Sequence, residues 1–151
     1  GISRSESKEL IDGYFKTYPR IREYMDESIE VARKQGYVET IFKRKRFLPD
    51  IHSHNAVVRG YAERNAINAP IQGSAADVIK LAMVRIFQRF EDEGLRSKMI
   101  LQVHDELNFN VYRNEAERVK QIVLEEMERV MPLRVPLIAD CGEGKNWLEA
   151  H

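Results

Sequence analysis

The chain has 151 residues, of which 43% are apolar and 32% charged, and its 24 Lys/Arg are balanced by 24 Asp/Glu. This composition fits one soluble globular domain with a buried core, and no apolar run is long enough to cross a bilayer. The single Cys141 excludes an internal disulfide framework and favours a cytoplasmic location.

Two helices are predicted at the start of the chain. The first covers Ser5–Lys16, where apolar residues recur at helical spacing. Its inner face is expected to hold Leu10, Ile11, Tyr14 and Phe15. The second runs from Pro19, since proline is well tolerated in a first helical turn, to about Lys34, and Gly36 ends it.

A small basic hairpin is predicted next, with strands at Tyr37–Ile41 and Arg46–Leu48 and the run Lys43-Arg44-Lys45-Arg46 at its tip. From residue 33 to residue 64, eight Lys/Arg face three Asp/Glu, whereas ten acids outnumber six bases from residue 105 to residue 150. Such segregation suits a protein with one side that faces nucleic acid. A solvated basic loop is the alternative.

Two further helices are predicted, over Ala56–Ala66 and from Ser74 to Glu93, because Pro70 favours a kink or break between them. The small residues Gly73–Ala76 allow close approach of a neighbouring backbone or a ligand.

A polar row is predicted in the same stretch. Arg64, Asn68 and Gln72 follow an i, i+4, i+8 spacing, which aligns them on one face if the helix continues. Long planar side chains in such a row suit hydrogen bonding to base edges in a minor groove. A solvated helix face is the alternative.

The run Gln102-Val103-His104-Asp105-Glu106 lies between two strand-like segments, Lys98–Leu101 and Leu107–Val111. We expect its His-Asp-Glu triplet on a tight turn, where the carboxylates project together into solvent. Adjacent carboxylates repel, and Mg²⁺ held by one or two carboxylates plus substrate phosphates would compensate that repulsion. A hairpin with a merely polar turn is the alternative.

The end of the chain is predicted as a helix and a strand. The helix runs from Asn114, its cap, to about Val130, with Glu115 and Glu117 in the first turn, and the strand covers Leu137–Cys141. This order of elements predicts an α+β fold, in which helices cover one face of an antiparallel sheet with a central hairpin. Four residues are expected in the core, namely Met83, Phe87, Phe90 and Trp147.

Five stretches resemble, in order and spacing, motifs of the family A DNA polymerases, the bacterial DNA polymerase I type. They are Tyr18-Pro19 with Tyr24-Met25, Gly36–Thr40 leading to Arg46–Asp50, Arg64–Lys80, Gln102–Glu106, and Gly144–Trp147 through His151. The resemblance covers essentially the whole chain and implies a partial polymerase fold, with residues 1–54 derived from the fingers and 55–151 from the palm. The family's first catalytic aspartate and its nucleotide-binding fingers helix match nothing here. The chain is therefore expected to be a C-terminal part that begins, at Gly1-Ile2-Ser3, just after that helix.

The resemblance also implies an activity: addition of deoxynucleotides to a primer 3′ end, in DNA replication or repair, with two magnesium ions. Asp105 is expected to be a direct metal ligand shared with the absent aspartate, so the isolated chain should be inactive. Glu106 is expected to be a supporting ligand, and His104 to position the primer terminus.

Primer–template DNA and a dNTP are the implied partners, and no membrane is expected. Arg64, Asn68 and Gln72 would read the minor groove, and the run Lys43, Arg44, Lys45 and Arg46 would contact phosphates. The missing palm strand should leave an exposed surface through which the chain self-associates.

Two other functions stay open at this point. A metal-dependent nuclease would need Asp105 and Glu106 to recruit further acids, for which Asp77, Asp140 and Glu143 are available. A non-catalytic DNA-binding module would use the acids only to form the turn.

Overall fold

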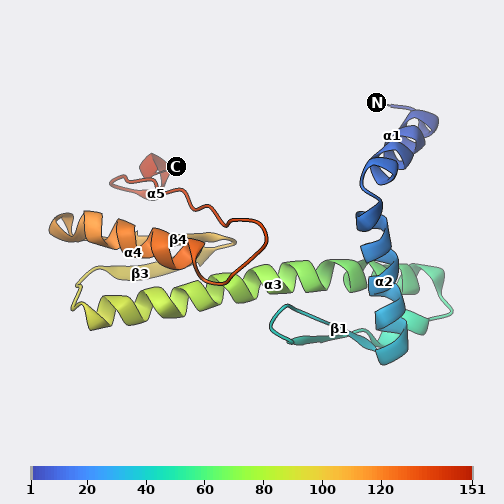
Figure 1. The fold of residues 1–151 in the computed structure, drawn as a ribbon, viewed down its shortest axis with the longest axis horizontal. Helices are drawn as coiled ribbons and strands as arrows, with labels where there is room; N and C mark the ends of the chain where they lie inside the picture. The colour runs from blue at the N-terminus through green and yellow to red at the C-terminus, as the bar shows by residue number, and fades with distance from the viewer. Residues whose placement is uncertain (1, 151) are drawn as a thin grey trace. The chain divides into compact units, whose positions relative to one another are not determined.

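The computed structural model describes residues 2–150, in which helices alternate with two small antiparallel sheets (Figure 1). The helices and strands, in chain order, are α1 (Arg4–Thr17), α2 (Pro19–Gln35), β1 (Tyr37–Glu39), β2 (Lys45–Phe47), η1 (Pro49–His52), α3 (Ala56–Asp92), β3 (Lys98–Val103), β4 (Glu106–Asn110), η2 (Arg113–Glu115), α4 (Ala116–Glu128) and α5 (Trp147–Ala150). The expected α+β class is confirmed. Residues 1 and 151, which the resemblance included, lie outside the described residues.

The contacts divide the chain into two units, one that ends at Ser74 and one that begins at Ala75. Each unit has its own cluster of buried apolar side chains. Within residues 2–150, no helix combines the length and the apolarity that a membrane span requires.

Helix α1 begins with a capping box. The Ser3 hydroxyl accepts a hydrogen bond from the Glu6 N–H at 3.2 Å, and the Glu6 carboxylate accepts one from the Ser3 N–H at 2.7 Å. The predicted inner face is wrong, because the helix has no buried residue. Leu10 is 65% exposed, although the Arg22 guanidinium lies 5.0 Å from the Phe15 ring centroid and the Tyr14 and Tyr18 ring centroids lie 5.2 Å apart.

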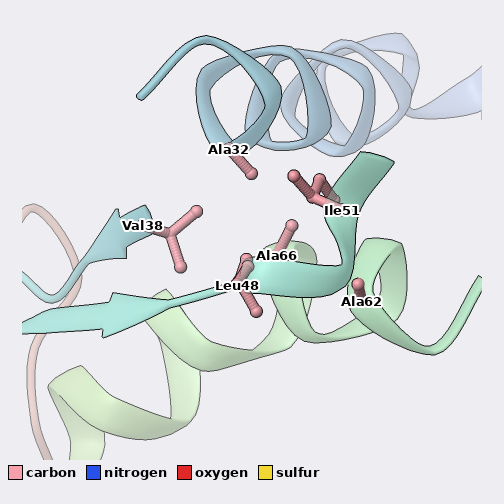
Figure 2. Close-up of a cluster of buried hydrophobic side chains, with 6 residues drawn as sticks. All are labelled: Ala32, Val38, Leu48, Ile51, Ala62 and Ala66. Carbon is pink, nitrogen blue, oxygen red and sulfur yellow. The ribbon is translucent and has the colours of Figure 1, made fainter. Parts of the chain in front are cut away.

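Helix α2 confirms the prediction at both ends. Pro19 is its first residue, and Gly36 follows the last with a positive φ of 79°, donating its N–H to the Ala32 carbonyl at 2.8 Å. Figure 2 shows the buried side chains that α2, β1, η1 and α3 bring together with the loop before η1, and these are Ala32, Val38, Leu48, Ile51, Ala62 and Ala66. This cluster is the core of the first unit.

The β1–β2 hairpin is confirmed, with Tyr37 opposite Phe47. Its loop is a tight turn from Thr40, whose carbonyl accepts the Lys43 N–H at 2.9 Å, followed by Lys43 itself at φ 65°. A turn followed by a left-handed residue is a common three-residue hairpin loop. The hairpin therefore carries the basic run on a defined backbone, but only Lys43 and Arg44 lie in the loop. The prediction that all four residues lie at the tip is wrong, because Lys45 and Arg46 pair with β1 as the first residues of β2.

Helix α3 runs without interruption for 37 residues, so the prediction of two helices separated at Pro70 is wrong. Proline lacks the N–H that would bond the carbonyl four residues earlier, which costs about 3 kcal/mol in a helix interior. Two side chains hold the neighbouring turns: the Ser74 hydroxyl donates to the Pro70 carbonyl at 2.5 Å, and the Tyr24 hydroxyl donates to the Ile67 carbonyl at 3.0 Å. The first of these bonds is local to α3 and the second is tertiary, and together they offset part of the cost of the proline.

The β3–β4 hairpin is the sheet of the second unit. Lys98 pairs with Asn110 and Val103 pairs with Glu106, with a register shift between Met99 and Leu101. The shift places a bulge in β3, which increases local twist. The hairpin predicted around Asp105 is thus confirmed. Lys98 begins β3 as expected, and the other strand ends lie one or two residues from their expected positions.

Helix α4 packs on this hairpin and on the end of α3. The buried core cluster of the second unit comprises Ile86, Phe90, Val119, Ile122 and Val123, with Met99, Leu107 and Phe109 among the residues packed against it. The predicted start at Asn114 is wrong, because Asn114 lies inside η2 and Glu115 is the residue before the first turn of α4. An additional short helical turn, η2, therefore precedes α4. Its last residue, Glu115, accepts hydrogen bonds from Ser97 through its carboxylate.

The tail after α4 departs from the prediction. Leu137–Cys141 is not a strand, since no described strand pairs with it and an isolated strand has no hydrogen-bond partners. Phe90 is buried and Met83 half-buried, as expected. Phe87 and Trp147, however, are 59% and 50% exposed, so their assignment to the core is wrong.

Ion pairs join α3 to α4. An Arg89 N–H donates to the Glu125 carboxylate at 2.8 Å, and the Arg118 guanidinium holds Glu93 at 2.6 Å. The hydrogen bonds from Arg89 lower the pKa of Glu125, and those from Arg118 lower the pKa of Glu93. Both carboxylates therefore stay ionised to lower pH than an unpaired glutamate does.

Glu115 anchors the beginning of β3. One carboxylate oxygen accepts the Ser97 hydroxyl at 2.6 Å and the Ser97 N–H at 2.9 Å, and both oxygens accept the Arg96 N–H at 3.2 Å. The hydroxyl bond from Ser97 is the main cause of a lowered pKa of Glu115. The same hydroxyl accepts the Tyr112 N–H at 3.0 Å, which ties η2 to the hairpin.

Acid is expected to destabilise the second unit through these glutamates. Their folded pKa values lie below the ordinary 4.5, so their contribution is present above that pH and is lost as the pH falls through the folded values. The melting temperature of the chain, followed by circular dichroism, should therefore drop below pH 4.5. Glu115→Gln should flatten this dependence, whereas Glu117→Gln, at an exposed site in α4, should not. An unchanged slope in Glu115→Gln would contradict the assignment.

Candidate functional site

The basic loop, as we name the loop residues Lys43 and Arg44 together with Lys45 and Arg46 of β2, is exposed over all four residues. Lys43 lies 3.5 Å from the Glu39 carboxylate, and the Lys45 ammonium lies 4.3 Å from the centroid of the Tyr37 ring. Exposed ion pairs of this kind contribute little, so a phosphate can replace them. The loop can therefore present cations to a polyanion.

The polar row lies on one continuous helix, which removes the doubt that Pro70 raised. Arg64, Asn68 and Gln72 are all exposed on α3, at spacings that put them on one face. The Arg64 guanidinium lies 6.0 Å from the Tyr61 ring centroid. The row is thus available to a ligand along about two turns of helix.

The basic loop docks directly beside the polar row. The Ile41 N–H donates to the Ser74 hydroxyl at 2.9 Å, and an Arg44 N–H donates to the Gly73 carbonyl at 3.1 Å. A Cβ at Gly73 would lie 2.6 Å from the Thr40 Cγ2 atom, so only glycine fits without a shift. The close approach predicted for the small residues is therefore made by the β1–β2 loop, which contacts Gly73. Gln72, the last residue of the polar row, directly precedes Gly73.

The acidic turn is tighter than expected. Only His104 and Asp105 form it, since Val103 ends β3 and Glu106 begins β4. His104 has a positive φ of 55°, a conformation that favours glycine in a two-residue hairpin turn, and the Gln102 side chain donates to the His104 carbonyl at 2.9 Å. The backbone of the turn is thus held in a conformation that is uncommon for residues other than glycine, although histidine adopts it more readily than most.

The two carboxylates differ in surroundings, so the expectation that they project together from the turn needs correction. Asp105 is exposed in the turn, whereas Glu106 is half-buried in β4 and accepts a hydrogen bond from the Trp147 indole N–H at 2.8 Å. Strand pairing with Val103 removes Glu106 from the turn. His104 is exposed beside Asp105, as a group that contacts a substrate would be.

The donor set of the turn fits magnesium. Mg²⁺ is commonly held by one or two carboxylates together with waters and substrate phosphates, and Asp105 is open to both. Within residues 2–150, no three His, Cys, Asp or Glu side chains gather into a metal site. The nuclease alternative therefore lacks the cluster with Asp77, Asp140 or Glu143 that it requires.

Several residues with contacts to these sites were missed by sequence reasoning. Thr40 forms the surface that meets Gly73, Gln102 bonds the acidic turn, and Trp147 bonds Glu106. An indole N–H next to a run with two glycines was the available signal for Trp147, since tryptophan usually finds a hydrogen-bond partner. Thr40 and Gln102 carried no comparable signal.

Known proteins match the whole of this arrangement. The model of DNA polymerase family A matches residues 1–149. DNA polymerase I of Streptococcus pneumoniae is 53% identical over 150 residues, and that of Geobacillus stearothermophilus is 46% identical over 149, each covering 99% of this chain. The chain spans only 17% of the length of either relative.

A solved structure agrees with the sequence matches. The POL domain of Pol1 from M. smegmatis, in complex with DNA primer-template and dNTP, superposes with a TM-score of 0.96 at 46% identity. The match covers 99% of this chain and 26% of that domain. The chain belongs to DNA polymerase family A.

Proposed function

We propose that this chain serves in a DNA-directed DNA polymerase that adds deoxynucleotides to a primer 3′ end, in replication or repair. The family match across residues 1–149 is the observation that carries the proposal. The M. smegmatis neighbour, which is described with primer-template and dNTP, supports these as partners. In this proposal residues 1–54 belong to the fingers and residues 55–151 to the palm, in a cytoplasmic enzyme.

In the second unit, Asp105 would hold magnesium as a direct ligand, and Glu106 would support it from the first position of β4. Bound magnesium would lower the pKa of the primer hydroxyl and balance charge on the attacking and leaving oxygens. The 3′ hydroxyl would lose its proton to solvent water, and its oxygen would bond to the α-phosphorus as the bond to the pyrophosphate leaving group breaks. His104 would position the primer terminus. One carboxylate does not hold two ions, so the chain by itself should not extend a primer.

In the first unit, the polar row and the basic loop would hold the duplex. Arg64, Asn68 and Gln72 bear donors for the minor-groove acceptors that all base pairs share, which permits contact independent of sequence. The run Lys43–Arg46 would contact phosphates, and binding should weaken as salt rises. Self-association through exposed apolar side chains stays a prediction.

A chimera tests this function. The matching 150 residues of the S. pneumoniae enzyme are replaced by this chain, and primer extension is measured with magnesium and four dNTPs. We expect a rate within about tenfold of the parent, a loss below about 1.4 kcal/mol in transition-state free energy. A parent enzyme deleted for the segment is the negative control. A chimera that binds the duplex but does not extend the primer would contradict the proposal.

A further inference from the structure

We propose that Trp147 is a positioning residue for Glu106, and that residues 142–150 fold to hold its indole against that carboxylate. The inference deepens the proposed function and rests on it, because the role of Glu106 is part of that proposal. Nothing in the sequence pattern assigned a task to Trp147, whose side chain was expected in the core.

The contact itself is specific. The indole Nε1–H is the only hydrogen-bond donor of a tryptophan side chain, and it donates to Glu106 Oε1 at 2.8 Å. Hydrogen bonds to an ionised carboxylate are about twice as strong as neutral ones. Trp147 is also 50% exposed, so apolar burial alone does not account for its position.

The segment around Trp147 is locked from within. The Asn146 side-chain oxygen accepts the Glu149 N–H at 3.1 Å, and the Glu149 carboxylate accepts the Asn146 side-chain amide at 3.0 Å and the Lys145 N–H at 2.9 Å. These reciprocal bonds resemble a capping box at the start of α5. They fix the first turn, in which Trp147 stands.

Two glycines let α5 fold back over the preceding backbone. A Cβ at Gly142 would lie 1.9 Å from the Ala150 carbonyl oxygen, and one at Gly144 would lie 2.6 Å from the Ala150 nitrogen. Because these neighbours are backbone atoms, a side chain at either position would displace α5. The fold of residues 142–150 thus depends on both glycines, and it places the indole of Trp147 against Glu106.

Both sequence neighbours of Asp105 are consequently fixed by side-chain hydrogen bonds. Gln102 bonds the His104 carbonyl on one side, and Trp147 bonds the Glu106 carboxylate on the other. Groups that orient metal-binding carboxylates from the next layer commonly tune affinity for the metal. Trp147 would therefore fix the orientation of Glu106 before substrate arrives.

The first test needs no catalysis. The full chain contains one tryptophan, so its ¹H–¹⁵N spectrum has one indole N–H signal. In Glu106→Ala, solvent exchange of this proton should accelerate about tenfold, the factor for one weak charge-assisted bond. Gly144→Ala should also accelerate this exchange, although Trp147 and Glu106 are both present. Glu143→Ala, at an exposed position, should leave the exchange rate unchanged. Unchanged exchange in Glu106→Ala, with the amide spectrum otherwise retained, would overturn the proposal.

The second test uses the chimera. Trp147→Phe should raise the Mg²⁺ concentration for half-maximal extension about tenfold, the low end of the range for such orienting groups, and lower kcat with the KM for dNTP unchanged. Leu148→Ala, 88% exposed in the same helix, should leave both unchanged. A lowered melting temperature with an unchanged Mg²⁺ requirement would reduce Trp147 to a structural role. A chimera without extension before any substitution would instead refute the proposed function.

Discussion

Asp105→Asn in the chimera is expected to reduce kcat for primer extension by about a thousandfold or more, the scale of lost transition-state charge stabilisation. Asparagine keeps the size and the turn preference of aspartate but removes the charge that a divalent ion requires. Affinity for the primer–template should stay within a few-fold of wild type, because the contacts along the duplex are assigned to the first unit and His104, which contacts the primer terminus, is unchanged. Single-turnover extension and equilibrium binding of labelled duplex measure the two quantities.

The matched control is Asp140→Asn, at an exposed position in the tail after α4. It should leave extension unchanged under the polymerase proposal, whereas a nuclease that recruits Asp140 would lose metal-dependent cleavage. Extension by Asp105→Asn within a few-fold of wild type would remove the metal-ligand role. A non-catalytic DNA-binding module would show duplex binding indifferent to either change, and no extension to lose.

Gly73→Ala is expected to loosen the docking of the basic loop on α3. The new methyl would meet the Thr40 Cγ2 atom at 2.6 Å, and overpacking of this kind costs about 1–3 kcal/mol. Thr40 does not rotate away freely, because its hydroxyl accepts the Arg44 N–H at 3.2 Å. The gain in helix propensity from glycine to alanine, about 1 kcal/mol, offsets only part of this cost. The exchange rate of the Ile41 amide, which bonds Ser74, reports the loosening directly.

A double-mutant cycle isolates the contact. Thr40→Ser removes Cγ2 and keeps the hydroxyl, so Gly73→Ala in that background should be neutral or stabilising. Gly13→Ala is the control, since nothing lies within 4 Å of its Cβ in α1 and the substitution should stabilise by about 1 kcal/mol. If Gly73→Ala instead increased the hydrogen-exchange protection of the Ile41 amide, the basic loop would not contact α3 at Gly73.

Local signals predicted the elements whose causes are local. Pro19 and Gly36 bound α2 because proline and glycine act on their own backbone, and both hairpins follow alternating runs around short turns. The break at Pro70 was predicted by the same local rule and is absent. Its compensation comes partly from Tyr24, 43 residues away in sequence, and no local rule contains that contact.

The candidate site divides in the same way. The alignment of the polar row and the turn at Asp105 follow from spacing, and both are present in the structure. The surroundings of Glu106 depend on Trp147, which lies 41 residues further along, and on two glycines whose use appears only when α5 folds back. The residue types alone identified Glu106 as a candidate, whereas its hydrogen-bond partner Trp147 is identified only by the folded structure.

Because the turn has only two residues, its length determines which face of the hairpin each side chain of β4 occupies. Side chains along β4 alternate between faces, so one inserted residue before Glu106 would send each following side chain to the opposite face of the hairpin unless a bulge absorbed it. Leu107 and Phe109 would then exchange places with Asn108 and Asn110, and the apolar contacts with α4 would be lost. A one-residue change in length at the tip of this hairpin is therefore disfavoured by the packing of Leu107 and Phe109, independently of any chemistry at Asp105.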